Sequence, residues 1–352
     1  MFEEFPKSEL DIFFVGTYTV SPGKGEGIYS CSLEPDGSMR ILEIFKAIPN
    51  PSYVILDRPN KRLYAVHEAG TDSAAVSALS YTDDYKLRLI NTQKVPGSSP
   101  CHLALDPSGE YLTVANYSSG NVVMYGIEAD GSLSELKDNV QHAGKSVNAA
   151  RQEGPHAHST VFGPEAKLWV ADLGTDEVKG YGLAEGKLRE DSSTKLAAGA
   201  GPRHMVFSPD GKYLFVVNEL DSTVSLLRHQ QGALSLLTSI STLPHDFTGE
   251  SYCAAIRIHP NGKFVYASNR GHDSIAVLEF DEEAETLTPV QYASTIGNFP
   301  RDFALTHDAK MLITSNQHSH DLYSYNLNGE TGKLEPTGEK LEIGSPVCVC
   351  MV

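Results

Sequence analysis

The sequence of 352 residues lacks the features that would place it in several large classes of protein. It holds 5 Cys and a single Trp, and no apolar run reaches the roughly 18 residues that a membrane-spanning helix needs. Basic residues are also scarce, since 28 Lys and Arg stand against 45 Asp and Glu and give a net charge of −17. Nucleic acids and anionic membranes both attract basic surfaces. We therefore expect neither of them as a main partner.

The cysteine pattern and the first residues predict a cytoplasmic protein. Cys31, Cys101 and Cys253 are isolated, and Cys348 and Cys350 lie two residues apart in an apolar segment. Sparse cysteines of this kind indicate reduced thiols, and they do not have the spacing of a four-ligand zinc site. The first ten residues are acidic and include no apolar segment of the kind that a secretory signal requires. We expect no metal and no cofactor.

A repeated unit runs through the chain. Each copy contains a turn, an apolar strand, a pair of polar residues, a short loop and a second strand. The copies occupy residues 60–79, 108–127, 165–183, 210–229, 261–280 and 308–327. A proline that opens another strand precedes most copies, and a further segment marked by Gly and Leu follows them. Four short strands in each repeat of about 50 residues, joined by hairpin turns such as DPSG and SPDG, indicate a β-propeller.

The two ends of the chain account for one more blade. Residues 10–33 match the second and third strands of a repeat, and residues 345–352 match only the first strand. Together they predict a blade that closes the ring, because closure removes exposed sheet edges. We therefore predict one all-β domain over residues 1–352, a seven-bladed β-propeller with four-stranded blades. Residues 141–155 form the longest irregular insertion, and such a loop within one domain is more often functional than a linker.

Polar residues concentrate where the first strand of each repeat starts and where the second strand ends. In a propeller these points meet at one mouth of the central channel, so residues from different blades come together there. The residue type changes between acid, base and amide from blade to blade, which a purely structural repeat does not need. The candidate site residues are Arg203, Arg257, Arg270, Arg301, His102, His156, His158, His204, Glu68, Glu219, Asn218, Asn269 and Gln317.

This group of residues predicts a binding site for a small anion. Arginine suits carboxylate and phosphate groups, and a cationic cluster in an acidic protein focuses the electric field on an anionic ligand. A Glu or a His beside the arginines can act as a general base, and an Arg can stabilise an oxyanion. The alternative is structural, because repeat proteins often bridge blades with Arg–Glu pairs and hold turns with Asn.

The sequence resembles the seven-bladed propeller lactonase family over essentially its whole length. The most specific pieces are GPRHMVFSPDGKYLFVVNEL (201–220), the strand that ends ASNRG (267–271) and the segment FPRDF (299–303). The family includes bacterial 6-phosphogluconolactonases and the fungal carboxy-muconate lactonizing enzyme. The resemblance implies a metal-free enzyme that forms or hydrolyses a lactone.

The resemblance also implies catalytic residues. In the lactonizing enzyme, a His, an Arg, a Glu and a second Arg have been proposed to form the site. By motif these residue types fall on His158, Arg203, Glu219 and Arg270 of this sequence. The tract GPHAH adds His156 as a second histidine, so the identity of the general base stays open.

Three functions are consistent with these features. The first is hydrolysis of 6-phospho-glucono-δ-lactone to 6-phosphogluconate, in the oxidative pentose phosphate pathway. The second is closure of a carboxylated muconate to its lactone, in which the arginines would bind the substrate carboxylates. The third is a non-catalytic propeller that binds a partner protein, which predicts an exposed apolar or aromatic patch. We take the first as the main hypothesis.

For this hydrolysis we expect each group of polar residues to have a separate role. Water attacks the ring carbonyl while Glu219 or His158 takes its proton. Arg203 and Arg270 hold the developing oxyanion or the carboxylate product. The phosphate is expected beside Arg301, together with His156 or His204.

Overall fold

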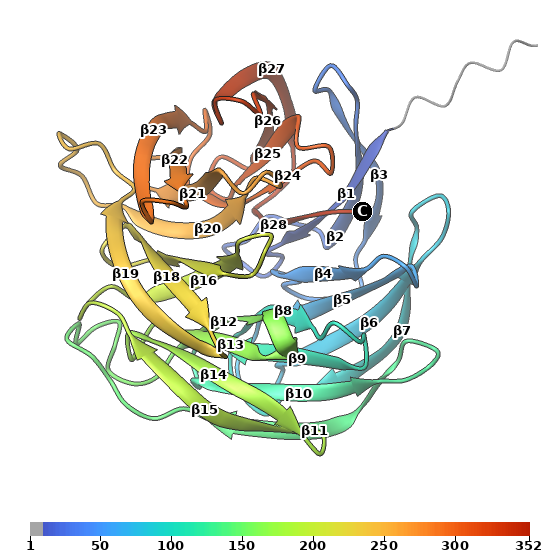
Figure 1. Ribbon diagram of the computed structural model, residues 1–352. Coiled ribbons are helices and arrows are strands. Elements are labelled where there is room, and N and C mark those ends of the chain that lie inside the picture. The colour runs from blue at the N-terminus through green and yellow to red at the C-terminus, as the bar shows by residue number, and fades with distance from the viewer. Residues whose placement is uncertain (1–9) are drawn as a thin grey trace, which may run out of the picture.

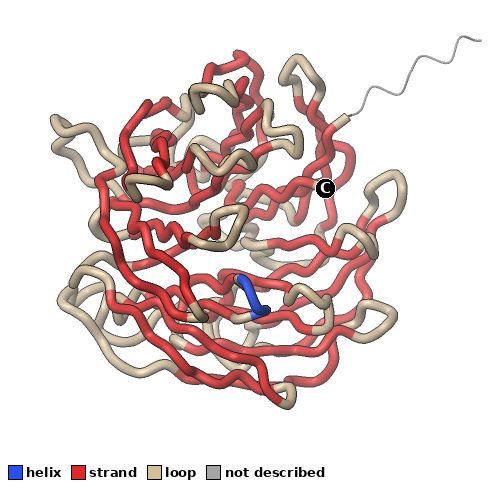
Figure 2. The backbone as a smooth tube through the Cα atoms, viewed as in Figure 1, coloured by secondary structure: helices blue, strands red, loops and turns tan. Residues whose placement is uncertain are grey.

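The computed structural model describes residues 10–352, which form a ring of seven four-stranded antiparallel sheets (Figure 1). Strands and the loops between them make up almost all of this range (Figure 2). The single helical element among the described residues is the short 3₁₀-helix η1 (Pro164–Ala166). The predicted all-β, seven-bladed β-propeller is confirmed.

Each blade runs from an innermost strand at the central channel to an outermost strand at the rim. The innermost strands, which contact one another from blade to blade, are β28 (Pro346–Met351), β4 (Val54–Asp57), β8 (Pro100–Leu105), β12 (Ala157–Phe162), β16 (Pro202–Phe207), β20 (Tyr252–Ile258) and β24 (Pro300–Leu305). The second strands are β1 (Asp11–Thr17), β5 (Arg62–His67), β9 (Tyr111–Asn116), β13 (Leu168–Asp172), β17 (Tyr213–Asn218), β21 (Phe264–Arg270) and β25 (Met311–Asn316).

The outer half of each blade consists of two further strands. The third strands are β2 (Ile28–Leu33), β6 (Ala75–Tyr81), β10 (Asn121–Ile127), β14 (Glu177–Ala184), β18 (Thr223–Gln230), β22 (Ser274–Asp281) and β26 (Asp321–Leu327). The outermost strands are β3 (Met39–Phe45), β7 (Leu87–Lys94), β11 (Leu133–Gln141), β15 (Lys187–Lys195), β19 (Ala233–Ser241), β23 (Thr286–Ser294) and β27 (Leu334–Glu342).

The second strands are buried on both faces because neighbouring blades pack face to face. All side chains of β17 and β25 are buried, and the sequences YLFVVN and MLITSN are rich in residues that favour strands. The outermost strand β19 instead mixes exposed and partly buried positions. Clusters of buried side chains join adjacent blades. The hydrophobic core therefore lies between the blades, and each blade turns a polar edge to the solvent.

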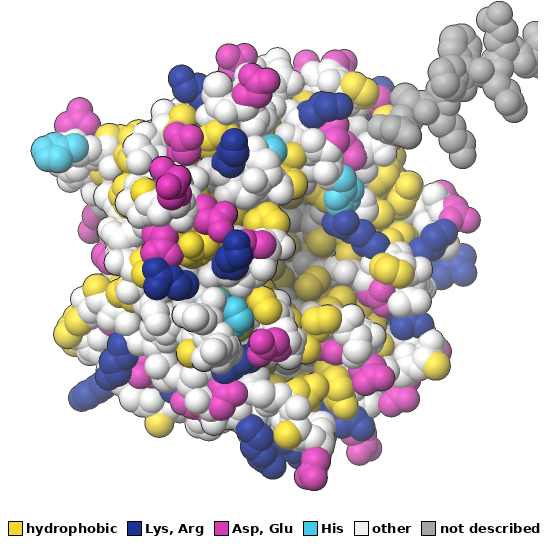
Figure 3. Space-filling view, viewed as in Figure 1, with side chains coloured by type: hydrophobic (Ala, Val, Ile, Leu, Met, Phe, Trp, Pro, Cys, Tyr) yellow, Lys and Arg dark blue, Asp and Glu magenta, His cyan; other side chains and the backbone are white. Residues whose placement is uncertain are grey.

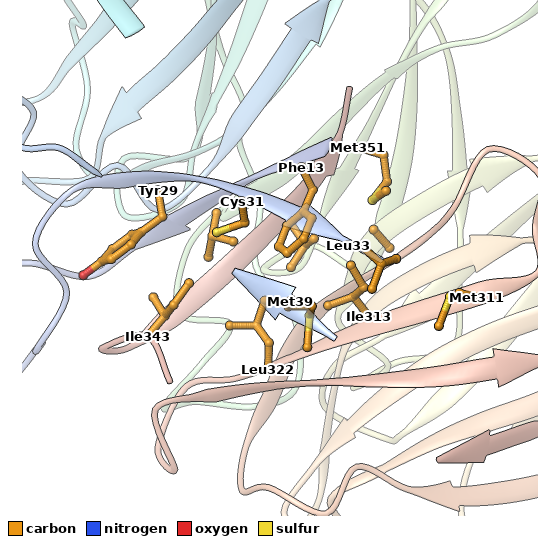
Figure 4. Close-up of a cluster of buried hydrophobic side chains, with 13 residues drawn as sticks. Phe13, Tyr29, Cys31, Leu33, Met39, Met311, Ile313, Leu322, Ile343 and Met351 are labelled. Atoms are coloured by element: carbon orange, nitrogen blue, oxygen red, sulfur yellow. The ribbon is translucent and has the colours of Figure 1, made fainter. Parts of the chain in front are cut away.

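The ring closes in a blade shared by the two ends of the described chain. Strand β28 pairs antiparallel with β1, from Phe13 opposite Met351 to Thr17 opposite Pro346. This blade packs on the blade of β24 to β27 through a hydrophobic cluster (Figure 4) that includes Phe13, Tyr29, Cys31, Leu33, Met39, Met311, Ile313, Leu322, Ile343 and Met351. The predicted closure by residues 10–33 and 345–352 is confirmed, and buried side chains fill the seam between these two blades.

A β-bulge near the start of most innermost strands shapes the candidate site. In β16, Arg203 is the extra residue in the register with β17. The corresponding extra residues of β8, β12 and β24 are Cys101, His158 and Arg301. A bulge leaves one residue out of the ladder and re-aims its side chain. Three of the predicted site residues therefore owe their direction to the same local irregularity.

Candidate active site

A buried carboxylate, Glu219, organises one mouth of the channel. It directly follows β17 and is 4% exposed. Its Oε2 accepts a hydrogen bond from Arg203 Nε at 2.9 Å and lies 2.8 Å from Arg270 Nη2, while its Oε1 accepts one from Arg151 Nη2 at 2.6 Å. Burial acts to raise the pKa of Glu219, but Arg270, Arg203, His158 and Arg151 hold it well below its ordinary value. Glu219 is therefore a charged anchor for three arginines.

The two most buried arginines are fixed by backbone carbonyls as well as by Glu219. Arg203 Nη1 donates to Ala254 O at 2.6 Å, and Arg270 Nη2 donates to Cys253 O at 2.8 Å. The Arg270 guanidinium also lies 5.2 Å from the centre of the Phe299 ring. Arg203 Nη2 and Arg270 Nη1 have no hydrogen-bond partner among residues 10–352. These two nitrogens are free to donate to a bound oxyanion.

His158 lies beside this cluster as a neutral imidazole. It is 4% exposed, its Nδ1 lies 3.9 Å from Cys101 Sγ, and its ring packs edge-on against Tyr117 at 5.4 Å. Burial and then Arg203 lower the pKa of His158 well below its ordinary value, against the opposing effect of Glu219. An imidazole that stays unprotonated at neutral pH can accept a proton.

His156 lies next to His158 but makes different contacts. Its ring stacks on Tyr117 with centroids 4.6 Å apart, and its Nδ1 lies 2.8 Å from Tyr117 O. Its Nε2 lies 3.3 Å from the carboxylate of Glu153, which is 62% exposed. Both ring nitrogens therefore have protein partners, whereas within residues 10–352 only Nδ1 of His158 has a hydrogen-bonding contact with a side chain.

A second carboxylate, Glu68, lies at the same mouth in a neutral setting. Tyr18 Oη donates to both of its oxygens at 3.0 and 2.9 Å, and Ser52 Oγ donates to Oε2. Arg301 Nη2 in turn donates to Tyr18 Oη at 2.9 Å, with its guanidinium 5.3 Å from the Tyr18 ring. Burial raises the pKa of Tyr18, so the phenol stays protonated. Among residues 10–352 no carboxylate lies within ion-pair distance of Arg301.

The structure separates some predicted residues from this mouth. His102 stacks on Tyr53 at 4.2 Å, and Arg257 forms an ion pair with Asp302 at 2.9 Å. Together with His204 they line a cavity of about 350 Å³ among the innermost strands. Figure 3 shows a hollow near the centre of the face on which the C-terminus lies. These residues lie further along the strands, past the bulge. Neither His102 nor Arg257 hydrogen-bonds to Glu219 in the described chain, so their part in one site with Glu219 stays a prediction.

His204 lies between the two groups. Its Nε2 is 3.3 Å from Arg203 Nη1, and its ring lies 5.0 Å from His102 and 5.5 Å from His158. Its Nδ1 is buried and has no partner within the described chain. Burial and Arg203 hold the pKa of His204 well below its ordinary value. It therefore supports Arg203 from inside the channel as a neutral side chain.

The predicted amide residues divide in the same way. Asn218 donates to Thr223 Oγ1 and Ser225 Oγ at 2.8 Å, and Asn269 donates to Thr242 O at 2.9 Å. Both asparagines are fully buried. They hold the framework through these bonds, and their contact with a substrate stays a prediction. Gln317 instead lines a pocket that includes Tyr18, and its Oε1 is buried without a partner in the described chain.

Arg151 is a site residue that the repeat did not predict. The repeat has two columns of variable polar residues, one where the first strand of each copy starts and one where the second strand ends, and Arg151 is in neither. It lies in the insertion 141–155, which buried contacts fix to the next blade. His142 Nδ1 lies 2.6 Å from Asp172 Oδ2, and Gln152 Nε2 donates to Asp176 Oδ1 at 2.7 Å. Arg151 thereby reaches Glu219 and also donates to Tyr117 Oη at 3.0 Å. The only signal in the sequence was the length of the insertion.

The described chain has no arrangement that suggests a metal centre or a membrane span. No group of three or more His, Cys, Asp or Glu side chains in residues 10–352 is placed to hold a metal ion. The cysteines are free thiols, four of them buried. No helix in the same range is long and apolar enough to cross a bilayer. The arrangement at Glu219 is a cluster of arginines around one carboxylate, with a neutral histidine beside it.

A seven-bladed ring with such a site defines a class of propeller enzyme. The chain belongs to the family described as lactonase, 7-bladed beta-propeller, whose model matches residues 12–351. The resemblance inferred from the sequence is therefore confirmed.

Similar proteins are known from several bacteria. A 6-phosphogluconolactonase of Bacillus subtilis (strain 168) is 36% identical over 342 residues, which is 96% of this chain and 97% of the relative. A crystal structure from Bacteroides fragilis NCTC 9343, described as a candidate 6-phosphogluconolactonase, has a TM-score of 0.92 at 31% identity and covers 99% of both chains. A periplasmic gluconolactonase of Pseudomonas aeruginosa has a TM-score of 0.91 at 28% identity, over 97% of this chain and 99% of its own.

Proposed function

We propose that the protein hydrolyses 6-phospho-glucono-δ-lactone to 6-phosphogluconate. The relatives support the reaction class, and the observation that carries the proposal is the anion site at Glu219. There, three arginines share one carboxylate, so the site keeps net positive charge beside a neutral histidine. A lactone carbonyl that becomes an oxyanion fits such a site.

In the proposed reaction, His158 accepts a proton from water as the water oxygen bonds to the lactone carbonyl carbon. The carbonyl oxygen takes up the negative charge and is held by Arg203 Nη2 and Arg270 Nη1. The tetrahedral intermediate then collapses, the bond from carbon to the ring oxygen breaks, and the ring oxygen takes the proton from His158. Water is added across one ester bond, and no other reactant is needed.

Glu219 is the less suitable base because both of its oxygens are engaged. Oε1 is bonded to Arg151, and Oε2 is bonded to Arg203 and Arg270. A carboxylate with a pKa held well below its ordinary value has little tendency to take a proton at neutral pH. We therefore assign Glu219 the role of orienting the two arginines, and His158 the role of base.

The test is the rate of lactone opening above the spontaneous background. The phosphorylated lactone is generated in situ, product formation is followed with and without EDTA, and glucono-δ-lactone is assayed in parallel. We expect acceleration of the phosphorylated lactone that EDTA does not change. Turnover of glucono-δ-lactone alone would contradict the proposal that the substrate is phosphorylated. Turnover of neither would overturn lactone hydrolysis, and a carboxylated muconate would be assayed next.

The cellular setting follows from the same proposal. We infer a cytoplasmic enzyme of the oxidative pentose phosphate pathway, supported by five free cysteines, four of which are buried. Cell fractionation with an antibody against this chain tests the compartment. Recovery in a periplasmic or secreted fraction would contradict it.

A further inference from the structure

A second pocket adjoins the mouth of the channel at the seam where the ring closes. It has a volume of about 520 Å³. Its walls come from the loop after β1, from the turn after β25 and from Ser345, just before β28. Tyr18 and Gln317 line it, and Tyr18 is also the partner of Arg301 and Glu68. Tyr18 therefore links the wall of this pocket to Arg301 and Glu68.

The charged side chains that line this pocket are basic. The described residues that line it include Lys24, His318 and His320 but no aspartate and no glutamate, although the whole chain has 45 acidic residues against 28 basic ones. Within residues 10–352 no carboxylate forms an ion pair with Lys24, whose side chain is exposed. A pocket with an unpaired ammonium and no carboxylate attracts an anion.

The pocket also offers directed donors. His320 Nδ1 accepts a hydrogen bond from Ser345 N at 3.1 Å, which leaves Nε2 as the ring nitrogen that can donate to a ligand. Burial and then His320 lower the pKa of His318 against the opposing effect of Asp273, and Arg301 and Arg270 lower it further, which puts His318 within electrostatic reach of both arginines. Imidazole donors and an ammonium together suit the several oxygens of a phosphate.

The loop that carries Lys24 is held in place. Asn50 Oδ1 accepts hydrogen bonds from Thr19 N at 2.8 Å and Val20 N at 2.9 Å, and Lys24 N donates to Ser345 Oγ at 3.0 Å. Across the seam, a Cβ on Gly344 would come within 2.0 Å of Lys24 O, so only glycine permits this approach. The loop is thus organised before any ligand binds, which lowers the entropy cost of binding.

We propose that the seam pocket is the phosphate subsite, in which Lys24, His318 and His320 hold the phosphate while the lactone ring lies at Arg203 and Arg270. This inference rests on the proposed function. It deepens that function by naming what distinguishes a phosphorylated lactone from an unphosphorylated one. Arg301 lies between the two regions, bonded to Tyr18, and adds positive charge where the sugar chain passes.

The test compares two substrates in charge variants of Lys24. For Lys24→Gln and Lys24→Glu, kcat/KM is measured with the phosphorylated lactone and with glucono-δ-lactone. We expect the ratio of the two values to fall about tenfold in Lys24→Gln and further in Lys24→Glu, because a charge-assisted contact to phosphate is lost or reversed. The matched control is Arg189→Gln, which removes one exposed positive charge on β15 and leaves the ratio unchanged. An unchanged ratio in both Lys24 variants would overturn the subsite.

A binding measurement separates this inference from the proposed reaction. Isothermal titration calorimetry with 6-phosphogluconate and with gluconate needs no turnover. We expect Lys24→Glu to weaken 6-phosphogluconate about tenfold or more relative to gluconate. If neither lactone is hydrolysed but this selective loss is seen, the reaction is wrong and the phosphate pocket stands. If the lactones are hydrolysed and Lys24→Glu weakens both acids equally, the reaction stands and the subsite is wrong.

Discussion

Two glutamates at the same mouth of the channel have opposite surroundings. Glu219 is bonded to three arginines and is 4% exposed. Glu68 is bonded to the hydroxyl groups of Tyr18 and Ser52, and Arg301 is connected to it through the hydroxyl of Tyr18. Both follow the second strand of a blade, so the repeat gives them equivalent positions.

This difference shows how one repeat position can serve two purposes. At Glu219 the carboxylate fixes the direction of the arginines, and their charge exceeds its own, so an oxyanion is attracted to an ordered frame. At Glu68 the neutral hydroxyl groups satisfy the carboxylate and leave Arg301 without a carboxylate partner in the described chain. The first region is built for the reacting group, and the second leaves a cation available to the rest of the ligand.

The largest effect is expected from Glu219→Gln. Removing one partner of a buried charge cluster leaves the others uncompensated, which typically costs about 3–5 kcal/mol of unfolding free energy. We also expect kcat/KM to fall by about 10² or more, because the arginines lose their orientation. Urea unfolding and steady-state kinetics measure the two effects, and Glu219→Asp keeps the charge if the Gln variant does not fold. Wild-type stability and activity in Glu219→Gln would contradict the role of Glu219.

The next largest effect is expected from His158→Asn. Loss of a general base lowers kcat/KM by about 10²–10⁴. We expect kcat to fall while the unfolding free energy changes little. His156→Gln is the matched control, and we expect it to lose less than about tenfold, because both of its ring nitrogens already have protein partners. Equal losses in the two variants, or a larger loss in His156→Gln, would move the base to His156.

The pH dependence gives an independent test of the same base. The pKa of His158 is lowered, so the ring stays unprotonated while pH falls through about 6.5, the value of an unperturbed histidine. The acid limb of kcat/KM should therefore have its midpoint below pH 6.5. Glucono-δ-lactone is the better substrate for this profile, because a phosphate group has its own pKa near about 6. A midpoint at or above pH 6.5 would contradict His158 as the base.

A smaller effect is expected from Arg151→Gln. The side chain of Arg151 is 36% exposed, so its ion pair with Glu219 is partly screened by solvent. We expect kcat/KM to fall about tenfold and the unfolding free energy to change by about 1 kcal/mol or less. A double-mutant cycle with Glu219→Gln should be non-additive, since the two side chains are in contact. Additive effects would show that Arg151 acts independently of Glu219.

The smallest effect is expected from Glu68→Gln, which tests the comparison directly. Glutamine keeps one oxygen that can accept a hydrogen bond from Tyr18 or Ser52, so we expect the unfolding free energy to fall by about 1 kcal/mol. We expect at most a change of a few-fold in kcat/KM. If Glu68→Gln is as harmful as Glu219→Gln, the two regions are not different in the way their partners indicate.

Much of the mouth could be predicted because position within a blade repeats. The structure brings together four residues that lie at the start of the first strand or the end of the second strand of a repeat: His158, Arg203, Glu219 and Arg270. Arg151 could not be found in this way, because the insertion 141–155 lies outside the repeat and is placed only by its contacts with the following blade. Tyr18 follows the second strand of its blade, as Glu219 does, but a tyrosine has no charge that would mark it as a site residue.

The sequence by itself determined the seven blades, the shared closing blade and the two columns of variable polar residues, because turns and strand periodicity recur locally in each repeat. Only the tertiary structure decided which of those residues meet. Bulges aim Arg203, His158 and Arg301 at one mouth, while positions further along the same strands put His102 and Arg257 in another cavity. The physical reason is that the repeat in the sequence gives only the position of a residue within its blade. The partners of that residue depend on strand register, on insertions and on the packing of neighbouring blades.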